Sequence, residues 1–267
     1  MSKNYPLAAL LTDFGTSDHY VAAMKGAMLS ACPILSITDI THQIEPQNIS
    51  QAAYMLWAAY RSFPDDTVFC CVVDPGVGTS REIIVAKGRK HVFLAPRNGL
   101  LDFVLWTEET ESITVVQMNS PTVRSLLPPV VSLTFHGRDV FAPLTSYLAV
   151  GESPGSLGTT TAVDWLEAPF VDELRPLGQV RILHIDRFGN IVTNIAAPEG
   201  VQPSGVRGIR FGSVKIERWI ENYESAPANL LCLIVGSSGL VEIIMKRESA
   251  AEALKAKRTL GMKILRS

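Results

Sequence analysis

Short apolar runs alternate with amphipathic stretches along the first two-thirds of the chain. Residues 7–11 predict a buried strand, and the apolar positions of residues 17–31 recur at helical spacing after Ser17, a favourable cap. Residues 35–40 predict a second strand. A second helix is predicted to begin at Asn48 in the manner of a capping box, with Gln51 three residues later. The pattern therefore indicates repeated strand–helix units.

Residues 67–73 are apolar at nearly every position, which is typical of a strand covered on both faces in a parallel sheet. Residues 83–85 and 91–95 predict two further strands, and residues 138–149 predict a helix. We expect an α/β fold in this part of the chain, with helices on both faces of a mostly parallel sheet in three layers.

A segment rich in Gly, Pro and Ser begins at Gly151 and marks a domain boundary. Beyond it the apolar runs are short and leave little room for crossover helices, which predicts a small antiparallel sheet or barrel. Its expected strands are residues 179–185, 191–195, 208–211, 230–235, 240–245 and 262–265, with a helix over 250–257. We expect an N-terminal α/β domain over residues 1–155, a linker over 156–177 and a smaller C-terminal β domain over 178–267.

Composition narrows the possible functions. The chain has 267 residues, of which 47% are hydrophobic and 19% charged, so it can bury a sizeable core. Its 24 basic and 26 acidic residues give a formal net charge of −2, without the positive charge that a nucleic acid partner requires. We expect no nucleic acid partner.

The four cysteines lack the spacing of metal ligands, and Cys70 and Cys71 lie inside an apolar run where thiols act as small hydrophobes. This usage indicates a reducing compartment. The N-terminal apolar stretch is too short for a signal sequence, and no run of about 18 apolar residues predicts a membrane span. We expect a cytoplasmic protein that does not enter a membrane.

Two aspartates follow buried strands directly. Asp13 and Asp74 are expected at the carboxyl edge of the sheet, where α/β proteins bind ligands. Either residue alone could be a turn former, but two at one edge favour a site. The same edge is expected to collect four further polar residues, which could be ordinary loop residues: Asp18, His19, Asp39 and His42. Alternatively, a metal ion could be held near these strand ends by Asp13, Asp18, His19 and Asp74.

The usual phosphate cradles are absent from the sequence, since neither a GxGxxG after the first strand nor a P-loop occurs. His136 follows an apolar run that contains Phe135 and could face the same edge, or could be structural. In the C-terminal part, Asn190 offers the paired donor and acceptor that suit an adenine edge, and Phe188 or Phe135 could supply a stacking face.

Six motifs in this order resemble the S-adenosylmethionine hydroxide adenosyltransferase family, which is related to fluorinating and chlorinating enzymes. The resemblance runs from about Leu10 to Met245. Its motifs are Thr12-Asp13-Phe14-Gly15, Asp74-Pro75-Gly76-Val77-Gly78 with Arg81, Asn98-Gly99-Leu100-Leu101, Phe135-His136-Gly137-Arg138-Asp139, Asp186-Arg187-Phe188-Gly189-Asn190 with Thr193-Asn194, and Ser237-Ser238-Gly239.

This resemblance implies hydrolysis of S-adenosyl-L-methionine to adenosine and L-methionine without a cofactor or metal. It also implies a homotrimer whose sites lie between the N-terminal domain of one subunit and the C-terminal domain of its neighbour. Asp13 would hold the ribose hydroxyls, and Asn190 would read adenine with help from the chain near Met245 and Arg247. The methionine end would be held by Asp186, Ser237 and Ser238.

The same resemblance implies that Asp74, Arg81 and His136 generate the attacking hydroxide at the ribose C5′. Either Asp74 or His136 could accept the proton. Arg81 should lower the pKa of Asp74 and make it a weak base, whereas an imidazole pKa near 6.5 suits proton acceptance, which favours His136.

Two departures from the family pattern stand out. Gly236 occupies a position where Asn is expected, and Met245-Lys246-Arg247 is more basic than the usual neutral run. Three alternative functions remain open: a synthase of 5′-halo-5′-deoxyadenosine, a metal-assisted nucleoside or phosphate hydrolase, and a non-catalytic sensor of adenosine or S-adenosylmethionine.

Overall fold

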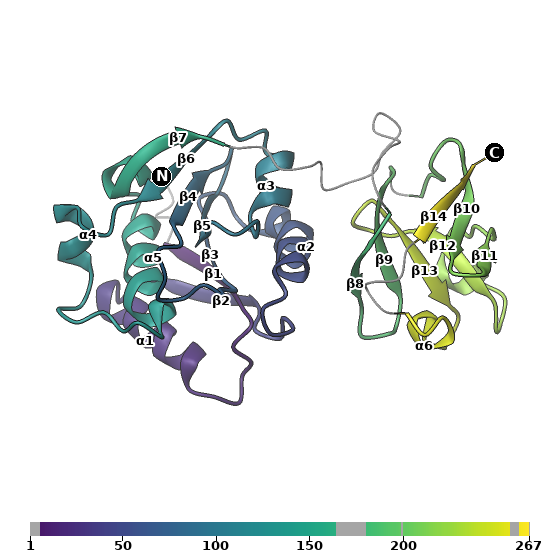
Figure 1. Cartoon of the computed structure of the whole chain (residues 1–267), viewed down its shortest axis with the longest axis horizontal. Coiled ribbons are helices and arrows are strands. Elements are labelled where there is room, and N and C mark those ends of the chain that lie inside the picture. The colour runs from purple at the N-terminus through teal and green to yellow at the C-terminus, as the bar shows by residue number, and fades with distance from the viewer. Residues whose placement is uncertain (1–5, 164–179, 199, 257–261, 267) are drawn as a thin grey trace. The chain divides into compact units, whose positions relative to one another are not determined.

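A computed structural model describes residues 6–163, 180–198, 200–256 and 262–266 (Figure 1). The chain divides into two compact units, Met1–Leu166 and Glu167–Ser267, and each is considered by itself. In the described parts of the chain, no helix combines the length and the apolar character needed to cross a membrane.

The N-terminal unit is built on a seven-stranded sheet with the order β2-β1-β3-β5-β4-β6-β7. Its strands are β1 (Leu7–Thr12), β2 (Ser36–Thr41), β3 (Val68–Val72), β4 (Ile83–Lys87), β5 (Val92–Pro96), β6 (Ser112–Val116) and β7 (Gly158–Ala162). Strands β2, β1, β3 and β5 are parallel, β4 is antiparallel to β5 and β6, and β7 is antiparallel to β6. The predicted mostly parallel sheet is confirmed. Strand β4 reverses direction because a tight turn, closed by Gly88 N–H donating to the His91 carbonyl at 2.9 Å, joins it to β5.

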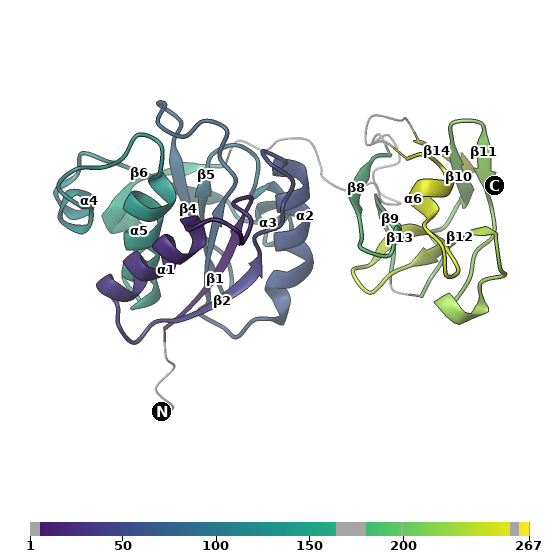
Figure 2. The ribbon, with the colours of Figure 1, turned by 90° about the horizontal axis from the view of Figure 1, so that it is seen from below.

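Helices cover both faces of this sheet, as Figures 1 and 2 show, so the predicted three layers are confirmed: α1 packs with α5 on one side, and α2 lies with α3 on the other. The helices are α1 (Tyr20–Ala31), α2 (Ile49–Ala59), α3 (Asp102–Thr107), α4 (Pro121–Leu126) and α5 (Ala142–Ala149). Short turns of helix occur at Tyr60–Ser62 and Pro154–Leu157, and a π-helix spans Gly137–Phe141 immediately before α5.

The start of α2 is as the sequence predicts. The side chain of Asn48 accepts a hydrogen bond from the Gln51 N–H at 3.0 Å, while the Gln51 side chain accepts one from the Glu45 N–H. The prediction that Ser17 caps α1 is wrong. His19 occupies the cap position without a side-chain hydrogen bond, and the helix begins at Tyr20, after the Gly15 turn has redirected the chain.

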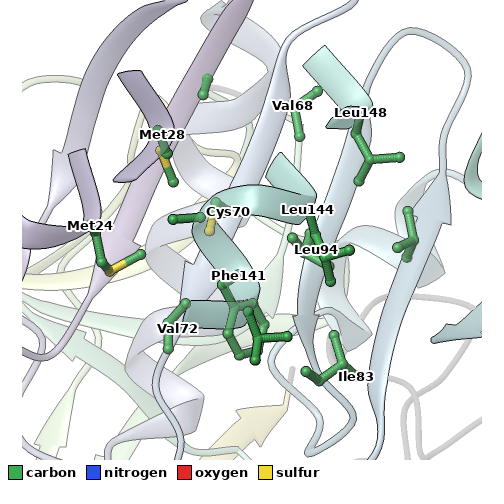
Figure 3. Packing of buried hydrophobic residues seen from close by; sticks show 14 of the residues in the cluster. Met24, Met28, Val68, Cys70, Val72, Ile83, Leu94, Phe141, Leu144 and Leu148 are labelled. Atoms are coloured by element: carbon green, nitrogen blue, oxygen red, sulfur yellow. The ribbon is translucent and has the colours of Figure 1, made fainter. Parts of the chain in front are cut away.

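The main core lies between the sheet and the α1–α5 layer (Figure 3). Met24 and Met28 from α1, Cys70 from β3 and Leu144 from α5 pack there with no exposed surface. Truncating one such side chain to alanine typically costs about 2–5 kcal/mol. Burial raises the pKa of the Cys70 thiol to about 12, so this cysteine is a small hydrophobe at neutral pH.

Strand β7 lengthens the N-terminal unit beyond its predicted end at residue 155. Three β-branched threonines, Thr159, Thr160 and Thr161, favour an extended edge strand, and they pair with β6 from Ile113 to Val115. Residues 158–162, which the sequence places in the linker, therefore belong to the sheet. The later linker residues 164–177 lie outside the described residues, as do Gln179 and Lys257 at the ends of predicted elements.

The C-terminal unit contains two small antiparallel sheets, of order β12-β13-β9-β8 and β11-β10-β14, which confirms the predicted β domain. A bridge between Val180 and Met262 links the sheets, and one core with Ile191, Phe211 and Ile243 lies between them. The sequence missed β11, which is too short to show a period. The elements are β8 (Ile182–Ile185), β9 (Ile191–Ala196), β10 (Val206–Phe211), β11 (Val214–Ile216), a 3₁₀ turn η4 (Tyr223–Ser225), β12 (Leu231–Val235), β13 (Leu240–Met245), α6 (Ala250–Ala253) and β14 (Met262–Arg266).

Candidate active site

A cavity of about 350 Å³ opens in the N-terminal unit at the carboxyl ends of β1 and β3. Four of the residues that the sequence singles out line it: Asp13 after β1, Asp74 after β3, and Phe135 with His136 before the π-helix. Parallel strands deliver their following residues to one edge, which is why segments far apart in sequence meet here.

Arg81 lies behind Asp74 and forms an ion pair with it through Nη2 and Oδ2. The side chains are 12% and 4% exposed, respectively, so water screens the pair little. Asp74 Oδ1 also accepts the Gly76 N–H at 3.0 Å. Gly78 allows the intervening turn, because it has φ +77° and a Cβ there would lie 2.3 Å from the Leu133 carbonyl oxygen. The Arg81 Nε is buried and has no hydrogen-bond partner among the described residues.

His136 lines the cavity and lies close enough to Arg81 and Asp74 to feel their charges. Its Nδ1 is buried without a hydrogen-bond partner in the described structure. Burial and then the Arg81 charge lower the pKa of His136 below 6.5, and the charges of Asp74 and Asp139 oppose this. The imidazole is therefore neutral at neutral pH. Neighbouring Gly137 fits closely, since a Cβ there would lie 3.0 Å from the Met24 sulfur.

One oxygen of the Asp13 carboxylate already has a hydrogen bond within the protein: Oδ2 accepts the Gln47 N–H at 2.8 Å. Aromatic rings form the neighbouring wall, with the Tyr20 and Phe135 centroids 5.1 Å apart and those of Phe14 and Phe135 6.1 Å apart. The sequence analysis missed Tyr20 as a lining residue. Its signal was an aromatic residue at the start of the helix that follows the first motif.

A second cavity, of about 610 Å³, lies within the C-terminal unit. It brings together five residues that the sequence predicts to bind substrate: Asp186, Phe188, Asn190, Met245 and Arg247. Two further residues of the C-terminal unit that the sequence predicts to bind substrate, Ser237 and Ser238, do not line this cavity. Ser237 is exposed, and Ser238 is half-buried with a buried Oγ that lacks a hydrogen-bond partner among the described residues.

Asp186 organises the β8–β9 turn below this cavity. Its Oδ1 accepts the N–H groups of Phe188 and Asn190 at 2.8 Å each, and its Oδ2 accepts the Asn190 Nδ2 at 2.8 Å. Gly189 is required at φ +84°, because a Cβ would lie 2.1 Å from the Ser249 Oγ. Asp186 is thus a structural turn residue as well as a lining residue, and the turn leaves Phe188 78% exposed.

Two further residues of this region escaped the sequence analysis. The Tyr223 hydroxyl donates to Glu242 Oε2 at 2.9 Å, and Tyr223 lines the cavity. Glu242 is 8% exposed. Burial raises the pKa of Glu242, as does the Asp186 charge, while the Tyr223 hydrogen bond lowers it. The only signal for Glu242 was a charged residue inside an apolar strand.

Of the remaining polar residues of the first edge, His42 and Asp39 have structural contacts. His42 Nδ1 lies 2.8 Å from Thr12 Oγ1, and Asp39 pairs with Lys25 at 2.7 Å. Asp18 and His19 are exposed. Within residues 6–163 and the other described ranges, no three His, Cys, Asp or Glu residues are grouped so that they could hold a metal ion. In the third motif, Asn98 Nδ2 donates to the Val73 carbonyl at 2.8 Å and fixes the end of β3.

Comparisons with known proteins agree with this arrangement of motifs. The chain is 36% identical over 262 residues to the (R)-S-adenosyl-L-methionine hydrolase of Thermus thermophilus, covering 96% of this chain and 98% of the relative. It is 32% identical over 262 residues to the hydrolase of the same name from Methanocaldococcus jannaschii, covering 93% and 91%. A fluorinase of Nocardia brasiliensis is 29% identical over 220 residues, covering 71% of each chain.

The fold also matches a solved structure. The crystal structure of an uncharacterized conserved protein from Thermotoga maritima aligns with a TM-score of 0.82 and 30% identity, covering 97% of this chain and all of that one. Residues 8–158 match the SAM hydroxide adenosyltransferase N-terminal domain, and residues 180–261 match the corresponding C-terminal domain. The chain therefore belongs to the SAM hydroxide adenosyltransferase family.

Proposed function

We propose that this protein hydrolyses S-adenosyl-L-methionine to adenosine and L-methionine, with water attacking the ribose C5′ in line with the departing sulfur. One observation carries the proposal. A neutral His136 with an unpartnered buried Nδ1 lines the same cavity as Asp74, which is paired with Arg81. The names of the Thermus and Methanocaldococcus relatives support the substrate.

The reaction needs an activated nucleophile more than it needs an acid. A sulfonium leaves as a neutral thioether, so no general acid is required. Water, with a pKa of about 15.7, must lose a proton as it attacks, and general base catalysis is typically worth ~10²–10⁴ in rate. Attack by a hydroxide-like nucleophile on a sulfonium neutralises charge, so a cavity that excludes bulk water favours the transition state.

In this mechanism His136 accepts the proton and Asp74 orients the water. Both oxygens of Asp74 already accept hydrogen bonds, one from Arg81 and one from the Gly76 N–H, so this carboxylate is fixed in place and can orient the water. His136 has a lowered pKa and a buried Nδ1 without a hydrogen-bond partner among the described residues, and in the Nε2–H tautomer this nitrogen can accept the proton. The fixed charge of Arg81 lowers the cost of forming a hydroxide-like nucleophile next to it.

Substrate recognition is shared between the two cavities in the proposed enzyme. Asp13 holds the ribose hydroxyls beside Phe135. In the C-terminal unit, Asn190, Phe188, Met245 and Arg247 hold adenine, and Asp186, Ser237 and Ser238 hold the methionine end. We further propose a cytoplasmic homotrimer, without a cofactor or metal, in which a neighbouring subunit contributes the C-terminal residues to each site.

Product analysis tests the reaction directly. Purified protein incubated with S-adenosylmethionine after exhaustive chelation should release adenosine and L-methionine in equal amounts. Loss of hydrolysis on chelation, restored by added metal, would instead support a metal-assisted hydrolase. Binding without turnover would support a sensor.

The similarity to fluorinases favours a second candidate, a synthase of 5′-halo-5′-deoxyadenosine. Incubation with fluoride or chloride distinguishes it, since the halogenated nucleoside would replace adenosine as the product. The proposed enzyme should form adenosine in both salts, because His136 and Asp74 line its cavity and can activate and orient water.

A further inference from the structure

The turn η4, Tyr223–Ser225, lies against the outer face of the four-stranded sheet in the C-terminal unit. Glu242 of β13 is opposite Ile234 of β12, and Ile244 is opposite Cys232. Because residues directly opposite in a sheet share a face, Glu242 lies with the small apolar cluster of Cys232, Ile234 and Ile244. Ala226, the residue after η4, packs into that cluster.

Two side chains, one on β13 and one directly after it, form hydrogen bonds that hold this turn in place. Glu242 Oε2 accepts the Tyr223 hydroxyl at 2.9 Å. Lys246 Nζ donates to the Glu224 carbonyl oxygen at 2.7 Å and to its Oε1 at 3.0 Å. Glu242 lies within β13, and Lys246 is the residue directly after the end of that strand. Consecutive residues of the turn are thus fixed by two charged side chains.

Gly236 leaves the space that Glu242 occupies. A Cβ on Gly236 would lie 2.0 Å from Glu242 Oε1 and 2.7 Å from its Cδ, so any larger residue must displace the carboxylate. Gly236 is one of the two departures from the pattern that the sequence otherwise resembles, and Lys246 belongs to the other, the basic run Met245-Lys246-Arg247. The structure gives both departures a role around the same turn.

The turn is also capped by Asn222, whose Oδ1 accepts the Ser225 N–H at 3.0 Å, but the turn's own side chains are not buried. Tyr223 is 50% exposed, and none of the residues in η4 is buried. Tyr223, Glu224 and Lys246 nevertheless all line the 610 Å³ cavity. A wall that is ordered before binding does not have to lose its conformational freedom when the ligand arrives, which raises affinity without any new contact.

We propose that Glu242 and Lys246 are positioning residues that hold Tyr223–Ser225 as a wall of the C-terminal cavity, with Gly236 making room for the Glu242 carboxylate. The inference rests on the proposed function in taking an adenosyl group as the ligand of this cavity. The two residues act through the turn, so their loss should weaken binding and leave the chemical step unchanged.

Two variants remove the ties singly: Tyr223→Phe keeps the ring but loses the hydroxyl, and Lys246→Met keeps the length but loses the ammonium. Each should raise the Kd of adenosine, measured by calorimetry, and the KM for S-adenosylmethionine about tenfold, which corresponds to ~1.4 kcal/mol, with kcat changed by less than about twofold. Glu242→Gln can still accept the hydroxyl and should stay within about threefold of the wild type.

Lys215→Met is the matched control, because Lys215 is exposed on β11 in the same unit and is not among the lining residues. This variant should bind adenosine like the wild type. Tyr223→Phe and Lys246→Met proteins with wild-type adenosine Kd and KM would overturn the inference.

A double-mutant cycle tests the role of Gly236. Gly236→Ala should displace Glu242 and break the same bond that Tyr223→Phe removes, so the double variant should bind adenosine no more weakly than the weaker single variant. Additive losses would overturn the link between Gly236 and the turn. Melting curves identify variants that have lost the fold.

The outcomes separate this inference from the proposed function. Wild-type protein that binds adenosine without hydrolysing S-adenosylmethionine contradicts the hydrolase, yet the wall is still tested by adenosine affinity. If the wild type hydrolyses S-adenosylmethionine and the Tyr223→Phe and Lys246→Met variants keep its adenosine affinity, only the proposed role of the wall is contradicted. Wild-type protein that does not bind adenosine contradicts both.

Discussion

The two cavities use their polar groups in opposite ways. In the N-terminal cavity, His136 Nδ1 is buried without a partner, and so is the Nε of Arg81 behind it, among the residues that the structure describes. In the C-terminal cavity, Asp186 accepts three hydrogen bonds and Lys246 donates two. A buried polar group without a partner costs ~1–3 kcal/mol, so its retention needs an explanation. This difference is what the proposed mechanism expects if the chemical step takes place at the first cavity and the second mainly recognises the substrate.

The largest expected effect comes from removing the water-activating groups. Asp74→Ala and His136→Ala should each lower the single-turnover rate by ~10²–10⁴ and leave the adenosine Kd within a few-fold. Asp65→Asn, at an exposed ion pair with Lys90, is the matched control. If both alanine variants hydrolyse at the wild-type rate, Asp74 is only a turn residue and His136 is only structural.

The pH dependence of the rate should follow His136. Because burial and Arg81 lower the pKa of His136, the imidazole stays neutral until the pH falls below the usual 6.5. The rate should be constant near neutrality and fall by about tenfold per pH unit below this lowered pKa. The folded chain then binds fewer protons than the unfolded chain, so this residue also makes stability rise with pH through the same window. A His136→Gln variant whose residual rate keeps the same acid limb would assign that limb to another group.

Asp13 should affect both binding and rate, because it addresses the ribose rather than the water. Two hydrogen bonds to a charged acceptor are worth ~1.5–3 kcal/mol each, so Asp13→Ala should raise the adenosine Kd at least about tenfold. The substitution also leaves the Gln47 N–H without its acceptor. Calorimetry beside single-turnover kinetics measures the two effects. A normal adenosine Kd would remove Asp13 from the ribose site.

The sequence predicted the two-part architecture and several of the residues that line each cavity, because strand ends and ordered motifs leave local signals. Asn48 is an example: its spacing from Gln51 predicted a helix cap, and in the structure its side chain accepts the Gln51 N–H. Contacts between distant segments were not predictable. Nothing local connects Tyr223 with Glu242, or Gly236 with the carboxylate that fills its space. The predicted start of α1 was wrong. Ser17 has a side chain that can cap a helix, but it lies two residues before the actual cap position, His19.

The smallest expected effects come from a matched pair of glycines, one at each cavity. Gly78 and Gly189 both have positive φ, and a Cβ would lie 2.3 Å from Leu133 O in the first case and 2.1 Å from Ser249 Oγ in the second. Alanine at such a position costs ~1–3 kcal/mol of local strain.

Gly78→Ala should shift the turn that carries Arg81 and lower kcat several-fold, with little change in adenosine affinity. Gly189→Ala should shift Phe188 and Asn190 and raise the adenosine Kd several-fold, with little change in kcat. Gly212→Ala is the control, since it has positive φ in the C-terminal unit but no atom within 4 Å of its Cβ. The division of roles predicts opposite responses from two chemically identical substitutions. If both variants lose kcat and affinity in the same proportion, the two cavities do not divide chemistry from recognition.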